Sequence, residues 1–152
     1  MAAWNRILVA VDETETSRRA LRYLGELSGA AGGLEICLLH VYPEPPPTYL
    51  REGHSAADYR QEKENRAQAI FAAATELLAG YHVPAAQVHT DCRMATTKTP
   101  ISSVILAARA EGGYGTVVVG KRGVSKAEEF LFGSISNAVA RACSGFTVWV
   151  VG

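Results

Sequence analysis

Short apolar runs, separated by longer amphipathic stretches, set the organisation of this chain. The run at 6–11 ends at an aspartate, the run at 34–41 ends at a Tyr-Pro pair, and a compact run spans 116–119. Runs that are apolar on both faces are typical of parallel strands covered by helices on each side. A weaker, alternating segment at 88–92 and a last run at 147–151 bring the predicted strands to five.

The stretches between these runs carry apolar residues at helical spacing. We expect a first helix capped by Thr14 or Thr16, and a long second helix that begins near 57 or 58 and stops at Gly80. A third helix would open at Pro100 and a fourth at Ser134. The positions expected to face inward are Ala20, Leu21, Leu24, Leu27, Ala67, Ile70, Phe71, Ala74, Leu77, Leu78, Ile101, Val104, Ile105, Ala108, Ile135, Ala138, Val139 and Ala142. Strict alternation of strand and helix predicts a doubly wound parallel sheet with right-handed crossovers.

A proline-rich segment from Pro43 to about Ala56 interrupts this alternation. It is too long for a simple turn, and three interpretations stay open: a flexible lid, a strap that binds a partner, or a plain surface loop. With 152 residues, 48% of them hydrophobic, the chain has the length and core of one domain spanning 1–152.

Charge and cysteine content narrow the function classes. Charged residues make up 20% of the chain and the formal net charge is zero, which argues against a protein that coats nucleic acid or binds membranes through basic patches. No apolar run approaches the roughly 20 residues that cross a bilayer, and the first residues lack the layout of a signal peptide. Cys37, Cys92 and Cys143 lack metal-ligand spacing and are expected to be buried, reduced thiols. We therefore expect a cytoplasmic protein.

The stretch from Gly120 to Ser134 carries the most specific chemistry. Gly120 ends the fourth predicted strand, Gly123 follows after two residues, and Gly133 precedes the serine that opens the fourth helix. A glycine at a strand end lets a ligand approach the backbone, and N–H groups of turns and helix N-termini bind anions. The cations nearby are Lys121, Arg122 and Lys126. A phosphate site is one interpretation, and a mere tight turn is the other.

Two common nucleotide loops do not fit this pattern. GxxxxGK[ST] is absent, which argues against a P-loop, and a dinucleotide fingerprint would follow the first strand. Here the first strand ends in Asp12 and Glu13. Asp12 is suited to ribose hydroxyls, although it could simply cap a helix. If the first and fourth strands are neighbours, ribose would lie at Asp12 and phosphates at 120–134 in one crevice.

The spacing G-x2-G-x9-G-[ST] at 120, 123, 133 and 134 resembles the ATP-binding signature of the universal stress protein family. The segments 7–17 and 38–41 resemble the first two strands of that family, so the resemblance covers essentially the whole chain. It implies an α/β fold, a single doubly wound five-stranded parallel sheet of order 3-2-1-4-5, Rossmann-like and similar to adenine nucleotide alpha hydrolases. It also implies ATP as the ligand, with AMP, ADP and an accompanying Mg²⁺ left open.

The resemblance carries roles over to individual residues. Asp12 would bind ribose or groups on the adenine side, and Val41 would line the adenine pocket through its backbone. The residues around ribose and phosphates would be Val119, Gly120, Arg122, Gly123, Gly133, Ser134 and Ile135. Relatives usually dimerise through the last strand, here Thr147 to Val151, where Trp149 could lie at the interface.

Three positions depart from the family pattern. Glu13 stands where many relatives have Gly or Phe, and this second acid could weaken triphosphate binding unless it points to solvent or helps hold Mg²⁺. Phe146 replaces a frequent proline, and the segment 113–115 lacks a frequent acid. We expect the last two departures to affect packing alone.

The sequence offers little for catalysis. Its four histidines are dispersed, without a recognisable base–nucleophile arrangement. We expect His40 to be a packed, hydrogen-bonded strand residue, whereas His54 could approach a bound nucleotide. Ser125, Ser134 and Ser136 could accept a phosphoryl group. Three functions follow: a nucleotide-binding stress or signalling module, a dimeric interaction protein independent of ligand, or a slow ATP-hydrolysing or autophosphorylating enzyme. The protein partners are unknown.

Overall fold

The computed structural model describes residues 3–121 and 134–152. Its strands are β1 (Ala3–Ala10), β2 (Glu35–Pro43), β3 (Val88–Ala95), β4 (Tyr114–Gly120) and β5 (Thr147–Val151). They form one parallel sheet in the order β3-β2-β1-β4-β5. The predicted strand number and order are confirmed.

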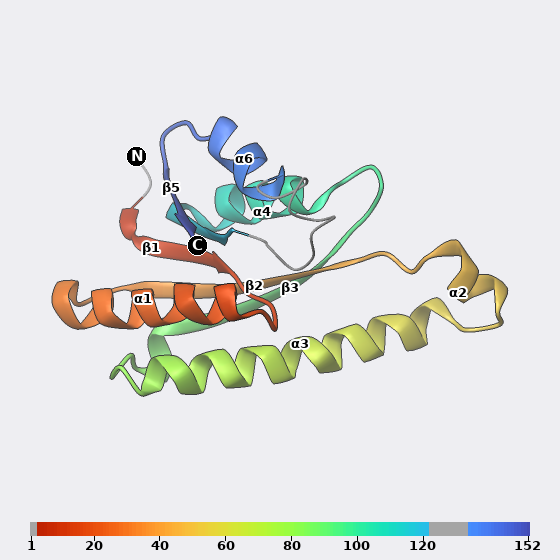
Figure 1. Ribbon diagram of the computed structural model, residues 1–152, viewed down its shortest axis with the longest axis horizontal. Helices are drawn as coiled ribbons and strands as arrows, with labels where there is room; N and C mark the ends of the chain where they lie inside the picture. Colours follow the sequence, from red (N-terminus) through yellow and green to blue (C-terminus); the bar gives the residue numbers. More distant parts are fainter. Residues whose placement is uncertain (1–2, 122–133) are drawn as a thin grey trace.

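Helices cover both faces of this sheet (Figure 1). On one face lie α1 (Glu15–Ala31) and α3 (Ala56–Ala79), and on the other lie α4 (Ile101–Gly112) and α6 (Ser134–Arg141). Two short elements complete the described chain, α2 (Pro47–Arg51) and a 3-10 helix (Ala85–Gln87). Within residues 3–121 and 134–152, no helix is both long and apolar enough to cross a bilayer.

Hydroxyl side chains fix where the two long helices begin. The Thr14 hydroxyl caps α1 by accepting a hydrogen bond from the N–H of Ser17, so Thr14 is the cap and Thr16 lies in the first turn. Ser55 caps α3 in the same way, which starts this helix one or two residues earlier than expected. Gly80 ends α3 with a right-handed backbone at φ −61°, and the left-handed residue is His82.

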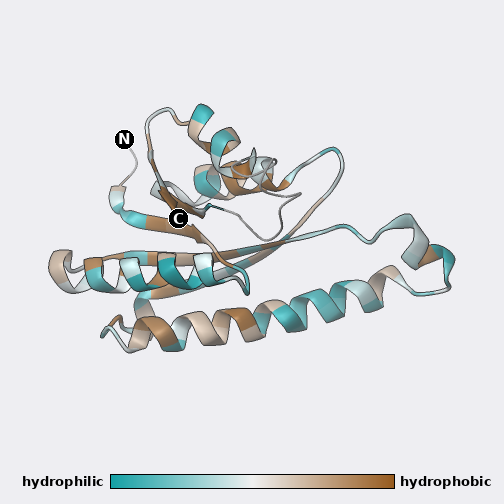
Figure 2. Cartoon of the chain, viewed as in Figure 1, coloured by the Kyte–Doolittle hydropathy of each residue, from teal (hydrophilic) through white to brown (hydrophobic). Residues whose placement is uncertain are grey.

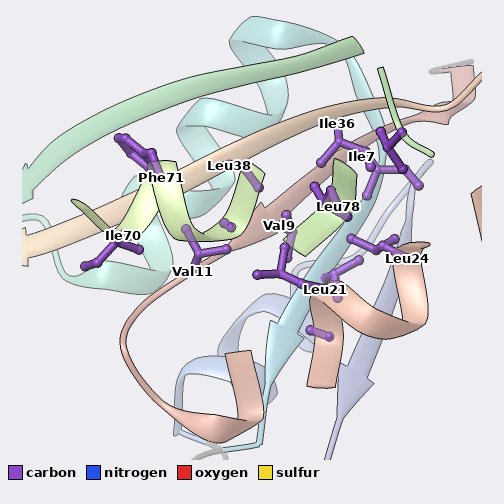
Figure 3. Close-up of a cluster of buried hydrophobic side chains, with 14 of the residues drawn as sticks. Ile7, Val9, Val11, Leu21, Leu24, Ile36, Leu38, Ile70, Phe71 and Leu78 are labelled. Atoms are coloured by element: carbon purple, nitrogen blue, oxygen red, sulfur yellow. The ribbon is translucent and has the colours of Figure 1, made fainter. Parts of the chain in front are cut away.

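Apolar side chains fill both sides of the sheet. Ile7 and Val9 of β1 pack toward α1 and α3, with Leu21, Leu24, Phe71 and Leu78 (Figure 3). Leu8 points to the other face, where it joins Ile105, Val117 and Val139. Figure 2 shows brown, apolar colour along the strands, and α3 changing from a polar N-terminal half to an apolar C-terminal half.

Two expectations about burial are wrong. Ala142 is exposed because α6 ends at Arg141, one residue before it. Only one of the three cysteines is buried, namely Cys37, whose pKa is raised by that burial. Cys92 is half-buried and Cys143 is exposed.

The proline-rich segment contains α2 and is more ordered than a plain loop. Tyr49 stacks on His54 with ring centroids 4.5 Å apart, and it meets the Tyr59 ring edge-on at 5.3 Å. The buried Tyr59 hydroxyl donates a hydrogen bond of 2.6 Å to the carbonyl of Pro43. These contacts fold the segment back on the start of α3, and Figure 1 shows both extending beyond the sheet.

Candidate functional site

A hollow of about 280 Å³ opens where β1 and β4 end side by side. The helices that follow these strands, α1 and α6, lie on opposite faces of the sheet (Figure 1). This makes the edge a topological switch point, the usual ligand position in open α/β sheets. The lining residues are Ala10, Val11, Asp12, Thr14, Thr16, Ser17, Leu39, His40, Val41, Ile101, Ile105, Val119, Gly120, Ser134, Ile135 and Ser136.

Six of the nine residues selected from the sequence line this hollow. They are Asp12, Val41, Val119, Gly120, Ser134 and Ile135. The other three, Arg122, Gly123 and Gly133, lie outside the described residues. The sequence therefore placed both ends of the glycine-rich stretch and the aspartate at one common hollow.

Asp12 shapes the turn between β1 and α1. Its Oδ1 accepts hydrogen bonds from the backbone N–H of Thr14 at 2.8 Å and from the Thr14 hydroxyl at 2.5 Å. Its own N–H donates to the Ser17 hydroxyl at 3.1 Å. Because Thr14 is the helix cap, Asp12 braces the capping residue instead of capping the helix itself. The bracing fixes where the carboxylate lies at the rim.

Gly120 allows β4 to end close against α1. A Cβ atom at this position would lie 2.8 Å from Cγ2 of Thr16, much closer than an ordinary van der Waals contact. Gly120 is not among the glycines with positive φ, so the requirement is space and not an unusual backbone. The absence of a side chain at Gly120 therefore makes room for Thr16, a packing requirement that the sequence did not predict.

Apolar side chains form the inner wall of the hollow. Leu39 and Val119 come from the buried strands, and Ile101 and Ile105 project from the first two turns of α4. Val41, at the end of β2, is half-buried beside them. A wall of this kind suits a flat, apolar ring. We had expected the two isoleucines to be core residues only, so their place in the hollow is new.

Hydroxyl groups form the polar part of the lining. They come from the first turns of two helices, with Thr14, Thr16 and Ser17 on α1 and its cap, and Ser134 and Ser136 on α6. Helix N-termini carry unpaired N–H groups and a partial positive charge, which favour anions. Ser136 was expected near the phosphates, and it lines the hollow. Thr16 was considered only as a helix cap and Ser17 was missed, although hydroxyl residues just after a predicted strand are a usable signal.

Glu13 does not line this hollow. Its exposed carboxylate forms a two-pronged ion pair with Nε and Nη2 of Arg66 on α3. The hydrogen bond from Arg66 lowers the pKa of Glu13, which keeps the carboxylate charged. The second acid at the crevice mouth is therefore turned toward α3 and neutralised there.

The two histidines of interest have different surroundings. His40 Nδ1 lies 2.8 Å from the carbonyl oxygen of Val11, so this ring nitrogen carries the proton and donates, and the expected packed histidine is confirmed. His40 also lines the hollow. His54 stacks on Tyr49 and lies 4.0 Å from Glu52, away from the hollow lining. In the part of the chain that the structure describes, no three His, Cys, Asp or Glu side chains gather as a metal site requires.

The family model described as the universal stress protein family matches residues 3–152. The chain belongs to the universal stress protein family. Solved structures with this fold include the hypothetical protein MJ0577, at 20% identity and a TM-score of 0.76 over 97% of this chain and 95% of that one. A universal stress protein in complex with cAMP matches at 20% identity and a TM-score of 0.68, over 97% and 96% of the two chains.

A third universal stress protein, from Archaeoglobus fulgidus in complex with dAMP, matches at 17% identity and a TM-score of 0.63 over the full length of both chains. At such identities these likenesses show the fold alone. A comparison with curated protein sequences found no match. The family and the strand order implied by the glycine motif are thus confirmed.

Proposed function

We propose that this universal stress protein binds an adenine nucleotide, ATP in first place, in the hollow between β1 and β4. The observation that carries the proposal is the composition of that hollow: apolar side chains and the N-termini of α1 and α6 line the same space of about 280 Å³. Two proteins with this fold have solved structures in complex with the adenine nucleotides cAMP and dAMP. We further propose a stress-response or signalling role, in which the ligand state changes contacts with partner proteins.

The lining suggests how the nucleotide lies. The adenine ring would pack between Val41 and the two isoleucines of α4, which offer the apolar part of the wall. Ribose would lie at Asp12, whose carboxylate is held at the rim by Thr14. The phosphates would extend toward the N-terminus of α6. The proposed site residues are Asp12, Val41, Val119, Gly120, Arg122, Gly123, Gly133, Ser134 and Ile135.

The number of phosphates is a separate part of the proposal. An unpaired Glu13 would repel a triphosphate, but its carboxylate is exposed and bound to Arg66. This pairing removes the repulsion that Glu13 would exert on a triphosphate, and ATP therefore stays first in the proposal. Any Mg²⁺ would arrive with the phosphates, and we assign it no protein ligand.

Calorimetric titration with ATP, ADP, AMP, cyclic AMP and adenosine tests the proposal. Ser134→Asp places a negative charge at the phosphate end and should weaken ATP binding at least tenfold, about 1.4 kcal/mol, while adenosine binding changes little. Ser103→Asp, on the exposed face of α4, is the matched control and should leave both unchanged. Absence of binding by the unaltered protein at millimolar nucleotide would refute the proposal.

We also propose a homodimer formed through β5. This strand is one edge of the sheet, and edges with exposed apolar residues invite pairing. Trp149 is half-buried and meets Tyr23 edge-on at 5.6 Å, so the exposed apolar side chain is Val150, at 50%. Val150→Lys should shift the protein toward monomer in sedimentation velocity. An unchanged dimer, or a monomeric unaltered protein, would contradict this interface.

The cellular setting completes the proposal. The three cysteines are all free, which suits a reducing compartment. We therefore place the protein in the cytoplasm, with residues 1–152 acting as one domain.

A further inference from the structure

A second hollow, of about 400 Å³, lies between α1 and α3. Its wall is mostly apolar, because Leu21 of α1 faces Ile70, Ala74 and Leu77 of α3 across it. Figure 3 shows Leu21 and Ile70 among the side chains that pack between these helices and the sheet. The hollow stays open because two exposed α3 positions on its rim, Ala69 and Ala73, carry only methyl groups. Its volume lies within the roughly 300–1,000 Å³ of small-molecule sites.

One end of this hollow is charged. Arg66 and Arg18 reach it from α3 and α1, together with Glu13 and the loop before α1. Both nitrogens of Arg66 that face Glu13 are engaged by its carboxylate, the two-pronged geometry with which arginine binds carboxylates. Nη1 of Arg18 donates to the carbonyl of Glu13 at 3.1 Å, so both guanidinium groups hold this one residue.

Two cations of α3, Arg66 and Lys63, lower the pKa of the Glu13 carboxylate, and Arg66 does so mainly through its hydrogen bond. The acid Glu62 on the same helix acts on Arg66 with the opposite charge. The Glu13 carboxylate therefore lies at a position that favours an anion, at the charged end of the mostly apolar hollow. A ligand with a carboxylate head and an alkyl chain would match both parts of the hollow: the head would pair with Arg66 and the chain would contact the apolar wall.

We propose that the hollow between α1 and α3 binds a small amphipathic carboxylate, a medium-chain alkyl acid, with its chain against Leu21 and Ile70 and its head on Arg66. The head takes the place that Glu13 holds in the free protein. The site is separate from the nucleotide hollow, although Val11 and Asp12 border both. It does not depend on the proposed nucleotide function and can be tested in nucleotide-free protein.

The first experiment compares octanoate with octanol and octylammonium by calorimetric titration, each below its aggregation limit. Octanoate should bind most tightly and octylammonium least, because the chain is constant and only the head changes. Hexanoate, octanoate and decanoate should differ by about fourfold in Kd for each buried methylene. Equal binding of the three head groups, a preference for octylammonium, or no octanoate binding up to about 10 mM would overturn the proposal.

Variants locate the chain of the ligand. Ala73→Phe should weaken octanoate more than about tenfold, because the phenyl ring occupies the space of several methylenes. Ala72→Phe is the matched control, since this neighbouring exposed alanine does not line the hollow. Both positions are exposed, so both variants should fold. Equal binding by the two variants would place the ligand elsewhere.

Two variants locate the carboxylate head of the ligand, and they should change octanoate affinity in opposite directions. Arg66→Gln should weaken octanoate about two- to fivefold, the range for an exposed ion pair. Glu13→Gln should instead tighten it by a similar factor, because the competing carboxylate is gone. Arg60→Gln, which breaks an α3 ion pair with Glu64 outside the hollow, should change nothing. Weaker binding in Glu13→Gln would show that the head does not replace this residue.

Discussion

Gly120 at the end of β4 and Thr16 in the first turn of α1 both line the nucleotide hollow. Replacing Gly120 with alanine tests how closely they pack. The new Cβ would lie 2.8 Å from Cγ2 of Thr16, about 1 Å inside the usual carbon–carbon separation of roughly 3.5–4.0 Å. Because Gly120 does not have positive φ, its backbone suits alanine. Any loss of stability must therefore come from crowding, and Thr16 must move to relieve it.

The expected magnitude follows from two opposing effects. Overpacking costs about 1–3 kcal/mol, and the lower part of this range applies because Cγ2 is a terminal methyl on a half-buried side chain. Replacing glycine with alanine also lowers the conformational entropy of the unfolded chain, which stabilises the folded state by about 0.4–1 kcal/mol. Gly120→Ala should thus lower the free energy of unfolding by about 1 kcal/mol. Thr16→Ser removes the methyl and keeps the hydroxyl, so in that background the loss should disappear and the gain of about 0.4–1 kcal/mol from the less flexible unfolded chain should remain.

Urea unfolding of the four proteins in this double-mutant cycle measures the coupling. It should equal the overpacking cost alone, about 1.5–2 kcal/mol. Gly29→Ala is the control, because no atom lies within 4 Å of its added Cβ and alanine favours helix α1. The same cycle followed by ATP titration should show weaker binding by Gly120→Ala and recovery in the double variant. Equal losses of stability with and without the Thr16 methyl would refute the crowding argument.

Two further predictions concern α1. Gly25→Ala should destabilise the protein by about 1–3 kcal/mol, since its Cβ would lie 2.5 Å from the Tyr81 ring; calorimetric melting that shows the stabilisation normal for alanine in a helix would contradict this. Hydrogen bonds from Arg22 and then Arg18 lower the pKa of Glu15 to about 2. Its folded pKa lies below the unfolded value, so the charged group stabilises the fold above about pH 4.5, and this contribution is lost as the pH falls toward 2. The difference in urea midpoint between the unaltered protein and Glu15→Gln should therefore shrink over that interval, and a constant difference would exclude the mechanism.

The strands that the sequence predicted best are those buried on both faces. The run at 116–119 is apolar throughout because β4 lies inside the sheet, between β1 and β5. β3 was predicted too short, since it continues to Ala95 through Arg93 and Met94. It is an edge strand, and the half-buried Arg93 pairs with Asp91 of the same strand and with Glu111 of α4. A charged residue with such partners breaks the pattern of hydrophobicity without ending the strand.

The order in the proline-rich segment was hidden for a different reason. Proline content argues against a long regular element, and α2 has only five residues. What holds the segment is a set of ring contacts between Tyr49, His54 and Tyr59, and these follow no period in the sequence. Such contacts depend on how the chain folds back, which a pattern along one segment cannot contain.

For the candidate site, the sequence predicted residues at strand ends better than residues on helices. Asp12 and Gly120 were accessible because the end of a parallel strand is a known ligand position. Ile101 and Ile105 were not, since their spacing is that of any buried helix face. The pairing of Glu13 with Arg66 joins residues 53 positions apart. No local signal connects them, so the effect of Glu13 on the site could not be predicted.

The adjacent acids at the end of β1 show how one short segment serves two hollows. Asp12 turns to the cap of α1 and borders both hollows, whereas Glu13 reaches α3 and borders only the second. The two carboxylates are separated by their partners: Thr14 holds Asp12 at the nucleotide rim, while Arg66 holds Glu13 on the α3 side. Arg66 then neutralises the carboxylate that would otherwise repel phosphates. A second acid after the first strand is therefore compatible with nucleotide binding when a cation on α3 can reach it. Whether a chain with the glycine motif tolerates this acid depends on which residues α3 carries.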